Sequence, residues 1–459
     1  MEALKLRALL VLIAGYFVLG YSFMLLRLPP SDVGVPLGEI VLALCLGTTN
    51  LPLCLRRMSQ AVFAQPLFLW WGVALVHLVL GLQSYGFWAI RDASHFLNSL
   101  FIIVGFAVAS QRVAWDRFNS WIPWIMGATI VYASTFLFQE EVKAISPTLS
   151  GASAQEVPLL GIFAGTSTIM LLAVTYLLVY RPPPAGKLSV WIAAACVAFV
   201  IVIFQARTTY LQLVALFAMF FVFRRDVLRR SLAIVPVFIL AVGILMQFEV
   251  KIPGRLSSEI SFAFFADHVA AIFGSAGSEE LAGAADGVQQ RFGWWQDIFD
   301  RLLEDPVRTF TGLGYGVPLV TNFINAESVA VREPHNSIMS MLGRLGAVGL
   351  VLYAAVNIVL FRALLSSLRA ARQQGWTRWE DTLLLMFGYF VVVFVMALTE
   401  DAFEKPYLTI PYYTFWGFVL RFRYELNRIS HEASARGVLP PDTLPAQAAQ
   451  ANAGAMAGP

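Results

Sequence analysis

The tetrapeptide Glu333-Pro334-His335-Asn336 holds the side chain of this chain best suited to proton transfer. It ends the only long polar stretch of the sequence, and an apolar run with glycines at 346 and 349 follows it directly. Pro334 favours the first turn of a helix, so we expect His335 at the start of that apolar helix. An imidazole titrates near neutral pH, so its protonation state can change under ordinary conditions. His335 is therefore the first residue in which we look for chemistry.

Four arginines accompany this histidine, namely Arg207, Arg291, Arg332 and Arg344. A guanidinium group stays charged at any ordinary pH, and the topology does not require these charges on the outward side. Arg344 lies about two helical turns into the apolar run, where a charge is costly, so it should face a bundle interior or a wet cavity. Simpler interpretations stay open: Arg207 can reach lipid headgroups, Arg291 and Arg332 can face solvent, and Arg344 can pair with an acidic side chain.

The composition indicates an integral membrane protein. Hydrophobic residues make up 58% of the chain and charged residues only 13%, whereas a soluble domain carries about a quarter charged residues. The net charge of +3 gives no argument for a nucleic-acid partner. Cys45, Cys54 and Cys196 lie in or beside apolar runs, which argues against a disulfide framework and a cysteine zinc site.

About twelve segments are long and apolar enough to cross a membrane, since a spanning helix needs roughly 20 such residues. They lie near 8–26, 37–55, 67–84, 93–110, 119–138, 157–180, 188–206, 207–223, 231–248, 337–363, 380–399 and 406–422. A polar pivot at 205–209 divides one very long run into two helices. The expected fold is an all-α, polytopic membrane protein.

The distribution of arginine and lysine predicts how these segments are oriented. Alternate loops hold basic clusters, at 56–57, 112–117, 181–187, 224–230 and 362–378. The loops between them are poorer in positive charge, and one holds Glu400, Asp401 and Glu404. The positive-inside rule then places both termini in the cytoplasm and the long loop on the opposite side. The N-terminal segment is expected to be a retained signal anchor.

Four regions follow from this map. Residues 1–248 form transmembrane helices one to nine, and 249–334 form a long, partly helical outward loop. Within the loop, 259–273 and 288–304 are expected to be amphipathic helices, 274–287 a flexible connector and 311–316 a glycine-rich turn whose amides can approach a ligand. Residues 335–429 form helices ten to twelve, and 430–459 a disordered cytoplasmic tail.

The pattern His335-Asn336, nine residues, Gly346, two residues, Gly349 resembles the signature of the O-antigen ligase and O-antigen polymerase superfamily of bacterial cell-envelope glycosyltransferases. The long outward loop, the number of spans, Arg207 at an outer helix end and Arg291 before the glycine turn support the resemblance. It covers about 150–422. Arg344 departs from the pattern, because relatives often have an acidic residue there.

The resemblance implies transfer of a glycan from undecaprenyl pyrophosphate on the periplasmic face of the bacterial inner membrane. The acceptor would be a sugar hydroxyl on lipid A–core or on another lipid-linked repeat. No metal or other cofactor is implied, and the sequence has no Asp-x-Asp motif and no histidine pair at ligand spacing. Membrane lipid is the remaining expected partner.

The resemblance also assigns roles. Arg207 and Arg291 would bind the pyrophosphate and stabilise the leaving group, while His335 takes the acceptor proton and direct attack inverts the anomeric carbon. Neighbouring arginines should lower the pKa of His335 and keep it neutral. Gly346 and Gly349 would form a small-residue face for helix packing.

A second group of residues is assigned to substrate binding. Asn336 would orient the site, and the aromatic members would stack on sugar faces or anchor the interface. The remaining members would help to hold the lipid pyrophosphate or the acceptor. The group comprises Arg332, Asn336, Arg344, Arg91, His95, Trp294, Trp295 and Tyr315.

Three alternatives to an O-antigen ligase stay open. A polymerase of O-antigen or exopolysaccharide would use the same donor chemistry. A transporter of lipid-linked glycans would show internal repeats and charges near mid-membrane in both halves, and no convincing repeat is visible. A non-catalytic scaffold would tolerate replacement of His335. The sequence leaves the sugars, the repeat structure and the oligomeric state open.

Overall fold

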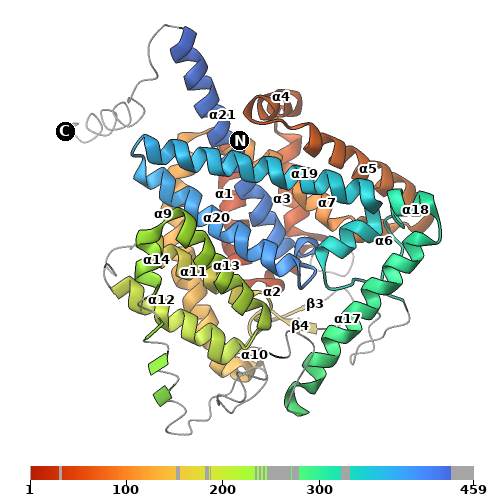
Figure 1. The fold of residues 1–459 in the computed structure, drawn as a ribbon, viewed down its shortest axis with the longest axis horizontal. Coiled ribbons are helices and arrows are strands. Elements are labelled where there is room, and N and C mark those ends of the chain that lie inside the picture. The colour runs from red at the N-terminus through yellow and green to blue at the C-terminus, as the bar shows by residue number, and fades with distance from the viewer. Residues whose placement is uncertain are drawn as a thin grey trace.

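The apolar runs form helices in the computed structural model of the protein (Figure 1). The structure describes residues 2–29, 34–150, 156–180, 186, 188–232, 235–236, 239–240, 243–244, 270, 279–321 and 331–435. Within these ranges the only strands are two short antiparallel pairs. They are β1 (Arg27–Leu28) with β2 (Val35–Pro36), and β3 (Thr148–Ser150) with β4 (Glu156–Pro158). The predicted all-α class is confirmed for the described residues.

The first half of the chain contributes α1 (Glu2–Leu19), α2 (Tyr21–Met24), α3 (Leu37–Gly47), α4 (Leu51–Ala61), α5 (Gln65–Tyr85), α6 (Phe87–Asp92), α7 (Ser94–Ser99), α8 (Phe101–Val108), α9 (Arg112–Ser134), η1 (Thr135–Phe138), α10 (Gln139–Ala144), α11 (Thr166–Tyr180), α12 (Leu188–Phe199), η2 (Val200–Phe204), α13 (Arg207–Phe223) and α14 (Arg225–Leu232). The second half contributes α17 (Glu279–Leu303), α18 (Pro306–Thr311), α19 (Ser337–Gln373), α20 (Thr377–Ala397), η4 (Ala402–Glu404) and α21 (Pro406–Ala435).

Several of these helices suit a membrane. Among the described residues, four segments are long and apolar enough to cross one, namely Gln65–Tyr85, Arg112–Ala144, Ser337–Gln373 and Thr377–Ala397. The pair α3 and α4 passes the same test together, but it is bent by 93°. Four shorter apolar segments accompany them, at Ser94–Val108, Thr166–Tyr180, Leu188–Phe204 and Arg207–Phe223. The total of twelve spans stays a prediction.

The helix α21 lies at the centre of the bundle, where it packs against α8, α19 and α20 (Figure 1). From Tyr407 to Phe422 nearly all of its side chains are buried. Gly105 of α8 and Gly417 of α21 face the backbone of the other helix so closely that no Cβ would fit at either position. Small residues thus bring the two backbones together, as is typical of helix packing in membranes.

The polar pivot at 205–209 divides two helices, as predicted. The π-helical turn η2 ends at Gln205, which adopts a left-handed conformation with φ 45° and ψ 41°. The next helix, α13, begins at Arg207. Short π-helical segments and left-handed non-glycine residues are frequent at functional sites.

A second break lies inside α19, at Gly346, where φ is 64° and ψ is −167°. The break frees carbonyl groups of the preceding turn, because their usual partners four residues later are displaced. Leu313 donates its amide to Gly343 O at 2.7 Å, and Gly314 donates to the carbonyl of Arg344 at 3.0 Å. The glycine-rich turn at 311–316 was expected to offer amides to a ligand, and these two amides instead bind the helix.

Several predicted boundaries differ from the structure. The helix α17 begins at Glu279, inside the region expected to be a flexible connector, and α21 continues to Ala435, past its expected end near 422. The span expected at 231–248 is described only in short pieces. The helix expected at 259–273 lies outside the described residues except for residue 270, and the tail from 436 onward lies outside them entirely.

Candidate active site

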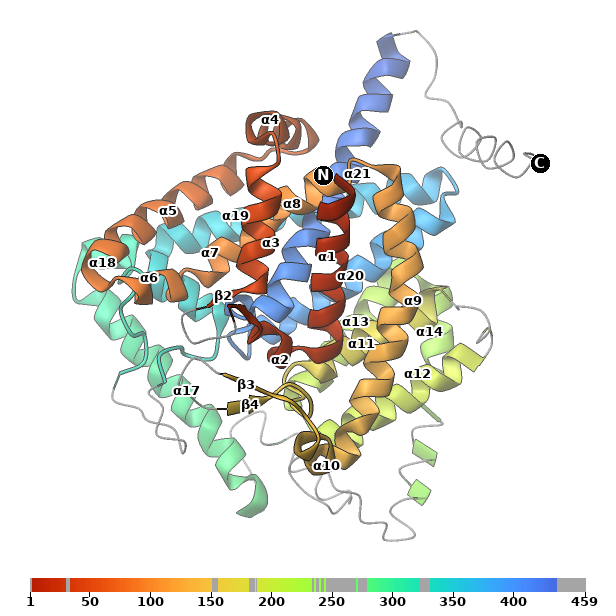
Figure 2. The same ribbon diagram turned by 180° about the vertical axis from the view of Figure 1, so that it is seen from behind.

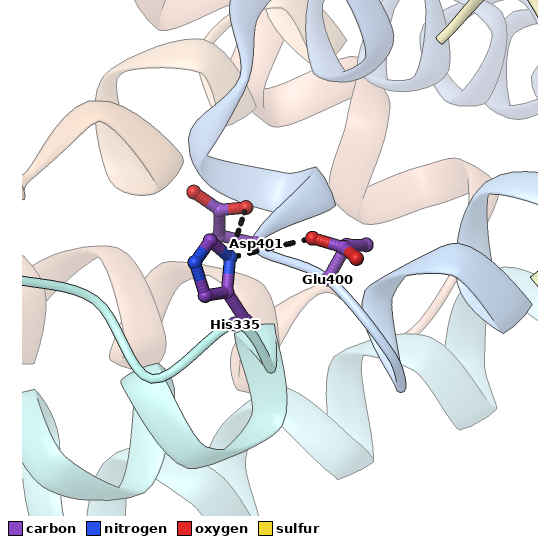
Figure 3. Close-up of side chains that lie close together, drawn as sticks. All are labelled: His335, Glu400 and Asp401. Carbon is purple, nitrogen blue, oxygen red and sulfur yellow. Dashed lines mark ion pairs between the residues drawn. The ribbon is translucent and has the colours of Figure 1, made fainter. Parts of the chain in front are cut away.

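The turn that follows α20 brings His335 next to two carboxylates (Figure 3). His335 Nδ1 lies 3.3 Å from Glu400 Oε2 and 3.5 Å from Asp401 Oδ1. These contacts are ion-pair contacts rather than aligned hydrogen bonds, since neither His335 Nδ1 nor Asp401 Oδ1 has a partner in hydrogen-bond geometry. Both ion-pair contacts start at Nδ1, and Nε2 lies on the side of the ring away from Glu400 (Figure 3).

Two further segments meet at the same turn. Arg291 of α17 donates one hydrogen bond to the carbonyl of Thr399 at 2.7 Å and a second to Glu400 Oε1 at 2.9 Å. Thr208 and Thr399 share a hydrogen bond of 2.9 Å between their hydroxyl groups. Thr208 directly follows Arg207, the first residue of α13. The structure therefore brings the elements that carry Arg207, Arg291 and His335 to one turn, which we call the 399–401 turn.

The backbone around His335 differs from the prediction. The helix begins at Ser337, with Asn336 as its N-cap, so Pro334 does not start it and His335 precedes the cap. The Asn336 side chain accepts hydrogen bonds from the amides of Ile338 at 2.9 Å and Met339 at 3.0 Å. Its Nδ2 also donates to Leu398 O at 2.9 Å, which ties α19 to the end of α20. Asparagine is among the residues most favoured as an N-cap.

His335 itself has a φ of 48°, in the left-handed region. A residue with a Cβ pays about 1–2 kcal/mol for this conformation, so its neighbours must hold it. Trp295 of α17 donates a hydrogen bond from Nε1 to the carbonyl of Pro334 at 3.0 Å. The Trp294 ring lies 5.8 Å from the imidazole between centroids, at a tilt of 36°. Both tryptophans therefore contact the histidine turn.

The electrostatics of His335 contradict the sequence-based expectation. The carboxylates of Asp401 and Glu400 raise the pKa of the imidazole to about 9, and they outweigh its partial burial. The expected lowering by arginines is wrong, because the guanidinium of Arg291 binds Glu400 rather than facing the ring. The resting site therefore favours a protonated imidazole at neutral pH.

The two carboxylates remain ionised despite their surroundings. Burial by itself would raise the pKa of Asp401, but Lys405 and His335 together lower it. Lys405 Nζ lies 3.0 Å from Asp401 Oδ1. Burial would likewise raise the pKa of Glu400, and the contacts with His335 and Arg291 lower it. Each carboxylate thus faces both the imidazole and a second cation.

The same three side chains are the group among the described residues that could hold a metal ion. Ligand atoms of His335, Glu400 and Asp401 all lie within 4.8 Å of one another. One imidazole and two carboxylates form a donor set that divalent transition metals accept. Arg291 and Lys405 already pair with the two carboxylates, and their positive charges oppose the binding of a cation. Metal independence stays a prediction.

A second ionic cluster, which we call the Asp92 cluster, consists of Asp92, Arg332, Glu333 and Arg344. One member, Glu333, lies two residues before His335 in the sequence. Arg344 binds Asp92 Oδ2 at 2.8 Å through Nη1 and pairs with Glu333 through Nη2. Asp92 Oδ2 also accepts a hydrogen bond from the amide of Gly316 at 3.0 Å and one from Arg332 Nη2 at 3.2 Å. The simpler interpretation of Arg344, pairing with an acidic side chain in the interior, is the one observed.

Two of the residues expected at the substrate are closed off, and a third, Arg91, is exposed and stays a prediction. His95 is buried, with Nε2 2.5 Å from the hydroxyl of Tyr413 and its ring stacked on Phe403, so it is unavailable to a pyrophosphate. Tyr315 is buried as well, which removes it from sugar stacking. Arg91 places its guanidinium over the ring of Trp88 at 5.0 Å.

Gly346 and Gly349, which were expected to form one small-residue face for helix packing, have different surroundings. The expected helix-packing face is a break at Gly346, where the backbone of Phe310 and Gly312 approaches too closely for any Cβ. At Gly349 the nearest atoms belong to Leu345 of the same helix. Only Gly346 therefore permits a close approach by another segment.

Sequence reasoning missed the carboxylates that define the site. Glu400 and Asp401 served only as outward-facing acidic residues in the topology, and Asp92 and Lys405 were given no role. A signal was present, since the acidic pair directly follows a predicted span that ends on the same side as His335. Spacing could not show which outward loop the histidine would meet.

The fold and this site define a class of protein. It is a helical membrane protein in which an imidazole, two carboxylates and an arginine meet where α13, α17, α19 and α20 converge. Such a set of groups suits proton transfer beside an anionic substrate.

Residues 192–354 match the family model described as O-antigen ligase. The match includes Arg207, Arg291 and His335, and it ends before Glu400 and Asp401. It confirms the resemblance to the O-antigen ligase and polymerase superfamily, and it indicates ligase or related polymerase activity. No curated protein matches the chain.

Proposed function

We propose that the protein is an O-antigen ligase of lipopolysaccharide biosynthesis. It would transfer a glycan from undecaprenyl pyrophosphate to a sugar hydroxyl of lipid A–core. The proposal places the 399–401 turn and residues 249–334 on the periplasmic face of the inner membrane, and both termini in the cytoplasm. The observation that carries it is the meeting of His335, Arg291 and the start of α13 at one turn.

The leaving group in this reaction is a lipid diphosphate. When its bond to the anomeric carbon breaks, the electron pair stays with the diphosphate, and the growing charge needs a positive partner. Arg291 uses two of its N–H groups on Thr399 and Glu400, which fixes its plane and leaves others for phosphate oxygens. Arg207 at the start of α13 would complete the pair. Contacts that strengthen as charge develops lower the barrier.

The acceptor hydroxyl must lose a proton as it attacks. His335 holds Nδ1 against Glu400 and Asp401, and Nε2 would take the proton from the hydroxyl. The carboxylates orient the ring and stabilise the imidazolium that forms, which is the role of the carboxylate in a catalytic triad. The new bond forms opposite the departing diphosphate, so the anomeric carbon is inverted.

The proposal is tested with purified protein, donor lipid and either acceptor. We expect glycan to appear on lipid A–core, and addition of EDTA to leave the rate unchanged. Extension of lipid-linked repeats, with no product on lipid A–core, would assign a polymerase that uses the same donor site. Absence of both products would reject a glycan transferase and leave transport or a scaffold role.

A further inference from the structure

A polar cavity of about 190 Å³ lies away from the 399–401 turn. It is bordered by the first turn of α1, the bend between α3 and α4, the end of α8 and the later part of α21. Three cationic side chains line it, Lys5, Arg57 and Arg421, together with one acidic side chain, Glu2. The lining therefore carries a net formal charge of two positive units.

Arg421 is a buried cation in the lining of this cavity. The residue is only 8% exposed, and its Nε has no hydrogen-bond partner among the described residues. Its Nη2 pairs with Glu425. A buried N–H without an acceptor is unfavourable, and native proteins rarely leave one unpaired. This N–H is itself shielded, and the guanidinium lies over the rings of Phe106 and Tyr424, 5.4 Å and 5.0 Å from their centroids, which hold the charge beside the cavity.

Two other features point the same way. Arg57 is half-buried and forms no ion pair within the described parts of the chain, so its charge is unbalanced. The helix α4 starts at the cavity with Asn50 as its N-cap, and the N-terminus of a helix attracts anions. Lys5 donates to Thr48 O at 2.8 Å and pairs with Glu2 at 2.7 Å, which fixes the bend beside that helix start.

We infer that this cavity binds a phosphate group, carried by a membrane phospholipid or free in solution. Two guanidinium groups and a helix start offer more donors than a carboxylate can accept, and they suit the several oxygens of a phosphate. A volume of about 190 Å³ is many times the roughly 10–15 Å³ that a cavity needs to hold one water, so a phosphate fits.

The cavity is separate from the proposed donor site. The helix α21 starts at Pro406, directly after the 399–401 turn and η4, and Arg421 lies fifteen residues further along it. At 1.5 Å per residue this is about 22 Å, most of a bilayer's hydrocarbon thickness. Figure 2 shows α4 and the N-terminal end of α1 together at one end of the bundle, with α2 at the other end of α1. Basic pockets at the ends of membrane helices commonly hold anionic headgroups.

The test uses the full-length protein in uncharged detergent, with binding measured by native mass spectrometry and titration. The probes are phosphatidylglycerol, diacylglycerol without a phosphate, and inorganic phosphate. We expect the protein to bind at least one phosphate-bearing probe about tenfold more tightly than diacylglycerol. Binding of phosphatidylglycerol alone would identify a lipid headgroup, and equal binding of inorganic phosphate a soluble anion.

The variants make the test specific to the cavity. Arg57→Gln should weaken binding about tenfold, whereas Arg56→Gln, which removes an exposed charge on the same helix outside the cavity, should not. Arg421→Gln should act like Arg57→Gln, with its folding checked because the residue is buried. The inference is overturned if diacylglycerol binds as well as both phosphate-bearing probes, or if Arg56→Gln weakens binding as much as Arg57→Gln.

Discussion

The two ionic clusters that flank Pro334 use the same chemistry in opposite environments. In the Asp92 cluster, the side chains of Arg344 and Asp92 are 3% and 2% exposed. At the 399–401 turn, those of His335 and Glu400 are 32% and 28% exposed. Both clusters join cations to carboxylates from distant parts of the chain, and only the second remains open to another molecule.

This difference in exposure indicates that the two clusters have different roles. Both terminal nitrogens of Arg344 bind carboxylates, one that of Asp92 and the other that of Glu333. The Asp92 cluster therefore fixes the position of Glu333, two residues before His335. At the 399–401 turn both ion-pair contacts of the imidazole use Nδ1, and the side chain remains partly exposed. Burial thus separates a group that positions the histidine from a group that can react.

The largest effect on transfer is expected for His335→Ala. Loss of a general base lowers a rate by about a hundredfold to ten-thousandfold, so transfer by the purified protein should nearly cease. The matched control is His431→Ala, which removes an exposed histidine near the end of α21 and should leave the rate unchanged. Equal rates for His335→Ala and the unaltered protein would remove this residue from the mechanism.

Removing a charge from the Asp92 cluster should lower the stability of the folded protein. Asp92→Asn leaves Arg344 without a full counter-charge, and breaking a buried ion pair costs about 3–5 kcal/mol. Asp116→Asn, which removes a half-exposed partner of Arg378, should cost less than about 1 kcal/mol. Thermal unfolding in detergent measures both. If Asp92 only positions the chain, any remaining transfer should keep the pH dependence of the unaltered protein.

Substitutions of Arg291 test its proposed contact with the diphosphate of the donor lipid. Arg291→Ala should slow transfer about a hundredfold to a thousandfold, because one contact to the developing charge is lost. Arg291→Lys should restore little, since an ammonium cannot bind Thr399, Glu400 and a phosphate in one plane. Arg308→Ala removes a 51% exposed arginine of α18 and serves as the control. Full activity of Arg291→Lys would show that charge alone suffices.

The sequence predicted those features that depend on local pattern. Apolar length predicted helices, the polar residues at 205–209 predicted the break before α13, and the cost of a charge in lipid predicted an inward-facing Arg344. The amphipathic helix expected at 288–304 lies within α17. Each of these follows from physics acting over a few residues.

Features that depend on long-range contact were not predictable. Glu400 and Asp401 lie 65 and 66 residues after His335, and only the fold shows that they face it and raise its pKa. Pro334 and Asn336 both favour helix starts. The helix begins after Asn336, because the side chain of this N-cap accepts hydrogen bonds from two backbone amides. Gly346 could pack inside a helix or break it, and contacts with Phe310 and Gly312 decide for the break.

The pH dependence of transfer by the purified protein tests the central claim most directly. The pKa of His335 is raised to about 9, so the neutral base should become tenfold more abundant with each pH unit and level off above pH 9. Asp401→Asn should move that midpoint to lower pH. The ion pairs of a histidine with a raised pKa stabilise the fold below its unfolded pKa near 6.5. This stabilisation is lost as the pH rises through about 9, so folding is checked at each pH.

A rate that rises with pH to a plateau near pH 9 is the expected result. A rate that falls as pH approaches 9, in protein that remains folded, would show that the imidazolium is the active form and would contradict the account.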